Sequence, residues 1–274
     1  MATNDSLKNT MTASNKQAPA AAATFKQYMG APNMKKKFEE VLGKRAPQFM
    51  TSMMNLVNNE KTLREAEPTS IITSCMIAAT LDLPVDKNLG YAWIIAYKDR
   101  NTGVPVAQFQ LGYKGYIQLA LRTAQYKNIN AIPIHEGELK KWDPLTEELE
   151  IDFEAKKSDA VTGYAGFFEL NNGFRKTVYW SRDKVAAHEL KFRKGRDMGK
   201  MWRDDFDAMA IKTVIRNLLS KWGILSIEMQ NAYSAEIASE TGGRIEVNTS
   251  EEGEAVFDIT PGDVSDFEEV LSAS

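Results

Sequence analysis

A dense group of basic and aromatic residues lies between residues 191 and 203, in the sequence KFRKGRDMGKMWR. Clustered cations can neutralise the phosphates of a nucleic acid, and aromatic rings among them can stack on unpaired bases. Gly195 and Gly199 would let the backbone approach a ligand closely. The alternative is a solvated charged loop that its two rings anchor to the core. The candidate contacts here are Lys191, Phe192, Arg193, Lys194, Arg196, Lys200, Trp202 and Arg203.

Two predicted helices and a hairpin carry further candidate contacts. In residues 113–124 the polar side chains recur every four residues, so that they share one helix face. In residues 205–222 two cations lie apart from the apolar stripe that starts at Phe206 and ends at Trp222. A solvated helix face is the alternative in each case. These candidates are Lys98, Arg100, Lys114, Gln118, Arg122, Lys212 and Arg216.

The charge of the chain is divided unevenly. Residues 228–274 contain 12 acidic residues and one basic residue, a net charge of -11, whereas the whole chain carries only -3. Residues 1–227 therefore carry +8. A basic body with an acidic tail indicates a polyanionic partner for the body and a separate role for the tail.

Motifs for covalent chemistry are missing or incomplete. The sequence GRDMGK at 195–200 has three residues between its glycines, where a phosphate-binding loop has four, and Met201 stands where that loop needs Ser or Thr. No GxGxxG, GxSxG or HExxH occurs, and Cys75, His135 and His188 have no partners at zinc-binding spacing. We therefore expect no catalytic residue, no metal site and no cofactor.

Two acidic clusters leave a metal-dependent nuclease open as a less favoured alternative. Each cluster also has an ordinary structural interpretation, the first as the solvent face of a strand and the second as the acidic start of a helix. The clusters are Glu147, Glu148, Glu150 and Asp152, and Asp204, Asp205 and Asp207.

The periodicity of the apolar residues predicts an α+β fold with a short antiparallel sheet flanked by helices. Helical patterns begin near residue 38, at Pro47 and at Pro68, and later at Ser181 and at Asp204 or Asp205. Alternating patterns predict a hairpin over 91–111 and strands at 128–134, 148–154, 161–170 and 174–180. We expect a flexible arm over 1–30, a core over 31–227 that binds a polyanion, and a mostly disordered acidic tail over 228–274, in which a short helix after Glu228 is possible.

The chain has the composition of a soluble protein. Hydrophobic residues make up 43% and charged residues 26%. The start lacks a signal-peptide pattern, and the densest apolar run, Tyr91 to Tyr97, is too short to cross a membrane. With Cys75 as its lone cysteine, the chain is expected to be a cytoplasmic protein that does not contact a membrane.

Two segments resemble a known family. The sequence QFQLGYKGYIQLALRTAQ at 108–125, preceded by AATLDLPVDKNLGYAWIIAY, resembles the core signature of the RecT family, the phage and prophage recombinases that anneal single strands. The sequence WRDDFDAMAIKTVIRNLLSKWG at 202–223 resembles the later motif of that family. The resemblance covers residues 35 to 225.

This resemblance implies DNA repair and recombination by ATP-independent annealing of single-stranded DNA. Members oligomerise into rings or helical filaments, and the annealed duplex is their product. The resemblance thus implies that the core over 31–227 binds DNA and oligomerises. Lys114 and the basic residues before the long helix should face DNA, and the N-terminal helices should lie at subunit contacts. A partner exonuclease and a host single-strand-binding protein are expected at the acidic tail. A passive strand-coating protein is the main alternative, because composition does not separate coating from annealing.

Overall fold

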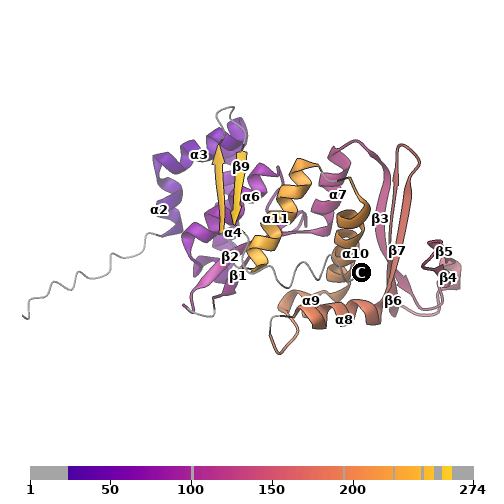
Figure 1. Cartoon of the computed structure of the whole chain (residues 1–274). Helices are drawn as coiled ribbons and strands as arrows, with labels where there is room; N and C mark the ends of the chain where they lie inside the picture. The colour runs from indigo at the N-terminus through magenta and orange to yellow at the C-terminus, as the bar shows by residue number, and fades with distance from the viewer. Residues whose placement is uncertain are drawn as a thin grey trace, which may run out of the picture.

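The computed structural model describes residues 24–99, 102–193, 195–224, 226–241, 244–249 and 255–260, and side chains up to residue 239. Helices and short antiparallel sheets follow one another along the chain, which confirms the predicted α+β class. Figure 1 shows the N-terminal helices at one end of the molecule and the β4–β5 hairpin at the other.

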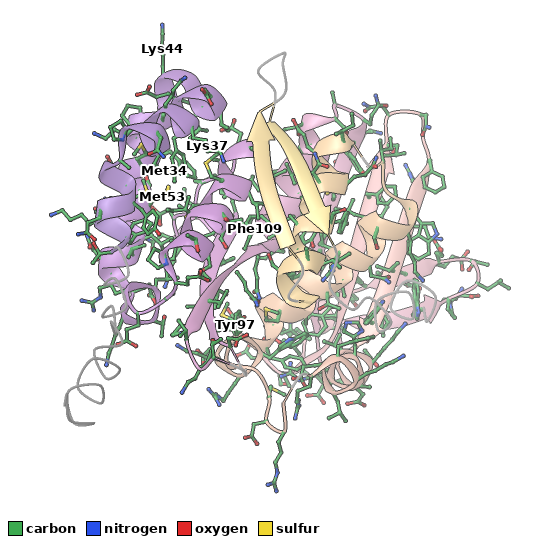
Figure 2. The ribbon with its side chains drawn as sticks, turned by 60° about the vertical axis from the view of Figure 1, so that its left-hand side comes forward. Met34, Lys37, Lys44, Met53, Tyr97 and Phe109 are labelled. Carbon is green, nitrogen blue, oxygen red and sulfur yellow. The ribbon has the colours of Figure 1, made fainter. Side chains whose placement is uncertain are left out.

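The N-terminal part is a group of helices around a shared core. Prolines at the first or second position start three of them, because the missing N–H is not needed there. Met53 and Phe109 lie inside the protein, whereas Lys44 points away from it (Figure 2). The helices are α2 (Phe25–Gly30), α3 (Pro32–Leu42), α4 (Ala46–Asn59), α5 (Lys61–Arg64) and α6 (Pro68–Thr80), with a 3-10 turn at Gly43–Arg45.

Helix α2 falls inside the segment that was expected to be a flexible arm. Thr24 and Gln27 form a capping box at its start, and Phe25 and Met29 are buried in the core. Packing against the next helices therefore orders residues 24–30. The rest of the expected arm, residues 1–23, lies outside the described residues.

The predicted hairpin is confirmed as β1 (Ala92–Lys98) and β2 (Pro105–Leu111), paired from Ala92↔Leu111 to Lys98↔Pro105. Helix α6 packs against β2, where the Ser74 hydroxyl donates to the Ala107 carbonyl at 3.1 Å. The hairpin leads directly into α7 (Tyr113–Arg122).

A three-stranded sheet forms the centre of the second half of the chain. Its order is β3 (Tyr126–His135), β6 (Val161–Leu170) and β7 (Arg175–Ser181), with β6 in the middle. The strands therefore form separate small sheets, since the β1–β2 hairpin is not hydrogen-bonded to this one.

A second hairpin, β4 (Leu139–Asp143) and β5 (Glu148–Ile151), stands beside this sheet. The sequence pattern missed β4, and the strand expected over 148–154 ends at Ile151, where a 3-10 turn follows at Phe153–Ala155. None of the five residues of β4 is buried. The strand therefore has no alternation of buried apolar residues from which it could be predicted.

Three helices follow the sheet: α8 (Arg182–Phe192), α9 (Lys200–Asp204) and α10 (Phe206–Trp222). The predicted caps are confirmed, since Ser181 accepts from the Lys184 N–H and Asp205 from the Ala208 N–H. Helix α10 packs closely on β6, where a Cβ added at Gly166 would lie 2.8 Å from Val214 Cγ1.

Structure extends further than expected into residues 228–274, where the sequence indicated a mostly disordered tail with at most a short helix after Glu228. Helix α11 (Ile227–Thr241) is packed into the core through Met229, Ala232 and Ala235, among others. Strands β8 (Arg244–Thr249) and β9 (Ala255–Thr260) form a further hairpin against α6 and α11. A boundary at residue 228 therefore falls in the first turn of a packed helix.

Candidate nucleic-acid interface

Helices α8 and α10 lie on the same face of the three-stranded sheet and bring cations from three elements together. Trp180 at the end of β7 contacts the His188 ring of α8, with 5.5 Å between ring centroids. We call this region the cationic surface and define it by Lys176 of β7, Lys184 and Lys191 of α8, and Arg216 and Lys221 of α10, together with the rings of Trp180, His188 and Trp222.

Ammonium groups of this surface lie on its aromatic rings. Lys184 Nζ is 4.3 Å from the centroid of Trp180, and Lys221 Nζ is 5.5 Å from that of Trp222. Lys176 Nζ, from β7, lies 4.1 Å from Trp222 and also pairs with Glu147. The tertiary fold thus gathers lysines of β7, α8 and α10 around two tryptophans.

The charges of this surface repel one another. Burial, and then the charges of Lys184 and Lys176, lower the pKa of Lys221. Burial lowers the pKa of Lys184 as well. Mutual repulsion of this kind is relieved when a polyanion binds.

Burial and the neighbouring cations favour the neutral form of His188. Burial, with the charges of Arg216, Lys191 and Lys184, lowers the pKa of its imidazole to about 4. An unfolded histidine titrates near pH ~6.5. Between these values the unfolded state binds more protons, so the free energy of unfolding should fall as the pH is lowered from about 6.5 to about 4. Because the ring is only partly buried, we expect this contribution to be about 1 to 2 kcal/mol.

Urea unfolding at pH 7.5 and 4.5 would measure this dependence, with His188→Gln as the matched variant. The difference between the two proteins isolates the imidazole, since all carboxylates are common to both. We expect the variant to lose less stability on acidification. An identical pH dependence in both proteins would show that His188 titrates normally.

The loop after α8 has one anchored and several exposed cations. Arg193 makes hydrogen bonds through Nε to both carboxylate oxygens of Glu189, at 3.0 and 3.1 Å, and Glu189 is only 4% exposed. Arg193 also donates to the Arg196 carbonyl at 3.3 Å. Its guanidinium therefore holds the loop, whereas the side chains of Arg196, Lys200 and Arg203 are exposed. Lys194 lies outside the described residues.

This difference predicts opposite results for two arginines of the same loop. Arg193→Ala would leave the Glu189 carboxylate buried without its partner, so we expect the melting temperature to fall by about 5 °C. Arg196→Ala should leave the melting temperature unchanged and reduce the slope of log affinity against log salt by about 0.7 to 1 for single-stranded DNA. Thermal unfolding and salt titrations of both variants would test this. Equal losses of stability would contradict the assignment.

The two rings of the predicted loop pack within the protein. The ring centroid of Phe192 lies 4.7 Å from that of His188 and 5.4 Å from Lys191 Nζ. Trp202 packs edge-on against Phe206, with 5.3 Å between centroids, and against the core. Both rings are partly exposed. They anchor the chain on either side of the loop.

The glycines of the sequence GYKG, residues 112–115 at the start of α7, are required by close packing. A Cβ added at Gly112 would lie 2.1 Å from the Gly90 carbonyl oxygen, and one added at Gly115 would lie 2.3 Å from the Tyr91 oxygen, so neither position has room for a larger residue. Tyr116 is fully buried. Of these residues, Lys114 is the exposed cation, and it remains a candidate contact.

The rest of the predicted face of α7 is partly used inside the protein. Gln118 is half-buried. Arg122 donates to the carbonyls of Leu81 and Asp82 at 2.6 and 2.7 Å, where it caps the end of α6. Arg122 therefore has a structural role at its present position.

Lys212 lies inside the protein and not on a basic surface stripe. Its ammonium donates to the Glu236 carboxylate of α11 at 2.6 Å, and Glu236 is fully buried. Arg216 lies 3.9 Å from the same carboxylate and is partly exposed beside His188. Tyr116 and the Leu111 N–H also donate to Glu236. Lys212 is thus not placed to contact DNA, whereas Arg216 lies at the edge of the cationic surface.

The hairpin tip is described only in part. Lys98 is exposed at the end of β1, whereas Arg100 lies outside the described residues. The structure does not place Lys98 in the cationic surface as defined above.

Sequence reasoning missed Lys176, Lys184 and Lys221, together with the rings of Trp180 and Trp222. No dense run of cations marks these lysines. Lys176 has only Arg175 beside it, and Lys184 has only Arg182 two residues before it. The signal that could have identified them is the proximity in sequence of a lysine and a tryptophan, as in Lys221–Trp222 and Trp180–Lys184.

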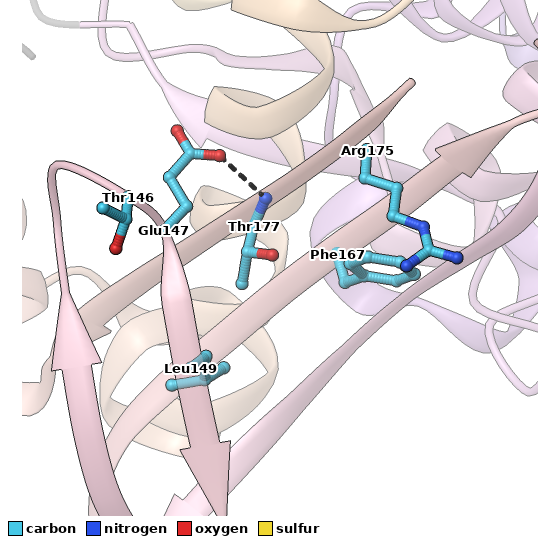
Figure 3. Close-up of a pocket in the computed structure, with 6 residues that line it drawn as sticks. All are labelled: Thr146, Glu147, Leu149, Phe167, Arg175 and Thr177. Carbon is cyan, nitrogen blue, oxygen red and sulfur yellow. Dashed lines mark hydrogen bonds between the residues drawn. The ribbon is translucent and has the colours of Figure 1, made fainter. Parts of the chain in front are cut away.

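The opposite face of the sheet holds a shallow pocket of about 410 Å³ between the β4–β5 hairpin and strands β6 and β7 (Figure 3). Glu147 contributes a carboxylate to this pocket, which accepts from the Thr177 N–H at 3.3 Å and pairs with Lys176. Its guanidinium belongs to Arg175, which pairs with Glu169 at 3.2 Å. The pocket is lined by Thr146, Glu147, Leu149, Phe167, Arg175 and Thr177.

The acidic clusters are engaged in structural contacts. Lys141 pairs with Glu148 at 2.7 Å, Asp205 caps α10, and Asp207 accepts from Tyr164 at 2.5 Å and from Arg182 at 2.9 Å. Among the residues that the structure describes, no three His, Cys, Asp or Glu side chains are grouped closely enough to hold a metal ion. Within the same residues, no helix is long and apolar enough to span a bilayer.

The comparisons with known proteins agree with the resemblance. The model of the RecT family matches residues 47–251. The uncharacterized protein YqaK of Bacillus subtilis (strain 168) is 55% identical over 270 residues, which cover 98% of this chain and 91% of that protein. Protein RecT of Escherichia coli (strain K12) is 26% identical over 229 residues, which cover 80% of this chain and 82% of that protein. Because the family model spans most of the chain, including α7, the sheet and α10, this protein belongs to the RecT family.

Proposed function

We propose that this protein binds single-stranded DNA along the cationic surface and anneals complementary strands as an oligomer, without a nucleotide cofactor. Membership of the RecT family supports a role in recombination by strand annealing. The observation that carries the proposal is the convergence of Lys176 of β7, Lys184 of α8 and Lys221 of α10 around the rings of Trp180 and Trp222. Burial lowers the pKa of Lys184, and burial together with the charges of Lys184 and Lys176 lowers that of Lys221. Exposed Lys114, Arg196 and Lys200 extend the contacts.

The proposed mechanism is electrostatic and needs no covalent step. Cations of successive subunits hold the phosphates of one strand and leave its base edges open. A second strand is then tested by base pairing and not by protein side chains, so binding is independent of sequence. The cations also reduce the repulsion between two polyanions, and stacking and pairing supply the driving force. The annealed duplex stays on the surface until it is released.

The acidic C-terminal region has a separate role in this proposal. Because α11 is packed into the core and the β8–β9 hairpin lies against α6 and α11, we place the start of the tail after residue 260, later than the sequence indicated. This tail is the proposed contact for a partner exonuclease or a host single-strand-binding protein. Such a protein would act in the cytoplasm of a bacterial host, on phage-type recombination.

Mixing two complementary fluorescent oligonucleotides with the full-length protein, with and without ATP, tests the proposal directly. Annealing should be accelerated equally in both conditions. Slower annealing than in protein-free buffer would support a passive coating protein. Fragments of a labelled strand in the presence of magnesium or manganese would support a nuclease.

A further inference from the structure

Several cations of residues 176–222 lie over aromatic rings. Among the described residues of this stretch, the contacts pair Lys176 and Lys221 with Trp222, Lys184 with Trp180, Arg182 with Phe206, and Lys191 with Phe192. All of these cations except Arg182 belong to the cationic surface.

The tryptophans of this surface are poorly placed to stack on bases. Trp180 is only 6% exposed, and its ring is in contact with Lys184 and with the edge of His188. Trp222 is half-buried, with Lys176 at 4.1 Å from its centroid and Lys221 at 5.5 Å. A base could reach these rings only if the lysines moved away.

We infer that Trp180 and Trp222 are positioning residues, which hold Lys184 and Lys221 on their rings so that the ammonium groups meet the phosphates of a strand. This inference rests on the proposed function. A ring face attracts an ammonium group through its quadrupole. A lysine that is already ordered on a ring loses less conformational freedom when it binds a phosphate. The rings therefore strengthen phosphate binding and leave the bases unread.

If this inference is correct, a DNA strand without bases should bind the protein about as tightly as an ordinary strand. Stacking of one base on a protein ring changes affinity about 5- to 150-fold. If the rings hold lysines, an oligonucleotide of abasic residues should bind the full-length protein within about twofold of a mixed-sequence strand of the same length. Fluorescence anisotropy at several salt concentrations would measure both affinities, and the two salt slopes should agree.

Two substitutions of Trp222 identify the role of the ring. Trp222→Leu removes the aromatic face and should weaken binding of both strands equally, by about 3- to 10-fold. Trp222→Phe retains a weaker face and should recover part of this loss. Trp142→Leu is the matched control, because Trp142 contacts Tyr179 at 6.0 Å on the hairpin side and should leave affinity unchanged. Melting temperatures establish that each variant is folded.

The outcomes separate the inference from the proposed function. Tight binding of the ordinary strand with binding of the abasic strand weakened fivefold or more would overturn the inference and leave the function intact. A loss in Trp222→Leu that is confined to the ordinary strand would do the same. If neither strand binds, the proposed function itself fails. The wild-type comparison decides the question even if Trp222→Leu does not fold.

Discussion

Replacing Glu236 with alanine is expected to lower the free energy of unfolding by about 3 to 5 kcal/mol. The carboxylate is fully buried and accepts from Lys212 at 2.6 Å and from the Leu111 N–H at 3.2 Å. Burial alone would raise its pKa, but Lys212 and Arg216 lower it below the usual value. Removal would leave the Lys212 ammonium buried without a counterion. Urea or thermal unfolding would measure the loss.

Two controls make this expectation specific. Glu228→Ala removes a carboxylate from the exposed start of the same helix and should change stability by less than about 0.5 kcal/mol. Truncation after residue 241 keeps Glu236 and should preserve a cooperative unfolding transition, whereas truncation after residue 227 should abolish it. Equal effects of the two glutamate substitutions would show that the buried ion pair does not stabilise the fold.

Acid should weaken the same contact. The pKa of Glu236 is lowered in the folded protein, so its stabilising contribution is present above the pKa of an unfolded glutamate and is lost as the pH falls through the folded value. Tyr116, which directly follows the GYKG sequence of residues 112–115, donates its hydroxyl to this carboxylate. Helices α7 and α11 are therefore parts of one packed unit.

The second large effect is expected when three cations of the proposed interface are removed together. The triple variant Lys184→Ala, Lys191→Ala and Lys221→Ala should bind single-stranded DNA about 10- to 100-fold more weakly near physiological salt. Each phosphate contact contributes about 0.7 to the salt slope of a single strand, so the slope should fall by about 2. Affinity measured over a range of salt concentrations gives both quantities.

A variant with the same change in net charge is the control. Lys140→Ala, Lys141→Ala and Lys157→Ala together remove three cations near the β4–β5 hairpin, at the other face of the sheet. If binding depends on local contacts, this protein should keep its affinity and its salt slope. Equal weakening in both triple variants would indicate a response to net charge alone and would remove the cationic surface from the proposal.

Much of the local structure was predictable because it depends on neighbours in sequence. Ser181 and Asp205 cap α8 and α10 as expected, since a cap needs only a short polar side chain and the next turn of the helix. The β1–β2 hairpin and the strand β6 followed from alternating apolar residues. The strand β4 was missed because it buries no residue and so carries no apolar alternation.

The roles of the cations were less predictable, because a lysine on a helix has the same sequence pattern whether solvent or a carboxylate lies beyond it. The helical period correctly separated Lys212 from the apolar stripe of α10, yet Glu236 of α11 covers that lysine. Arg193 was predicted to contact phosphate, and in the structure its guanidinium pairs with buried Glu189. The partners that decide these roles become visible only when the helices are packed.

The sequence by itself determined the α+β class, the helix caps and the basic body, because these depend on local patterns and on composition. The RecT family was identified from the resemblance of two segments of the sequence, and the family model confirmed it. Only the tertiary structure decided which cations face outward and which serve as counterions. It also brought Lys184 of α8 and Lys221 of α10 to the tryptophans of the cationic surface. The physical reason is that burial and Coulomb interactions depend on distances in space, which residues far apart in the chain acquire only on folding.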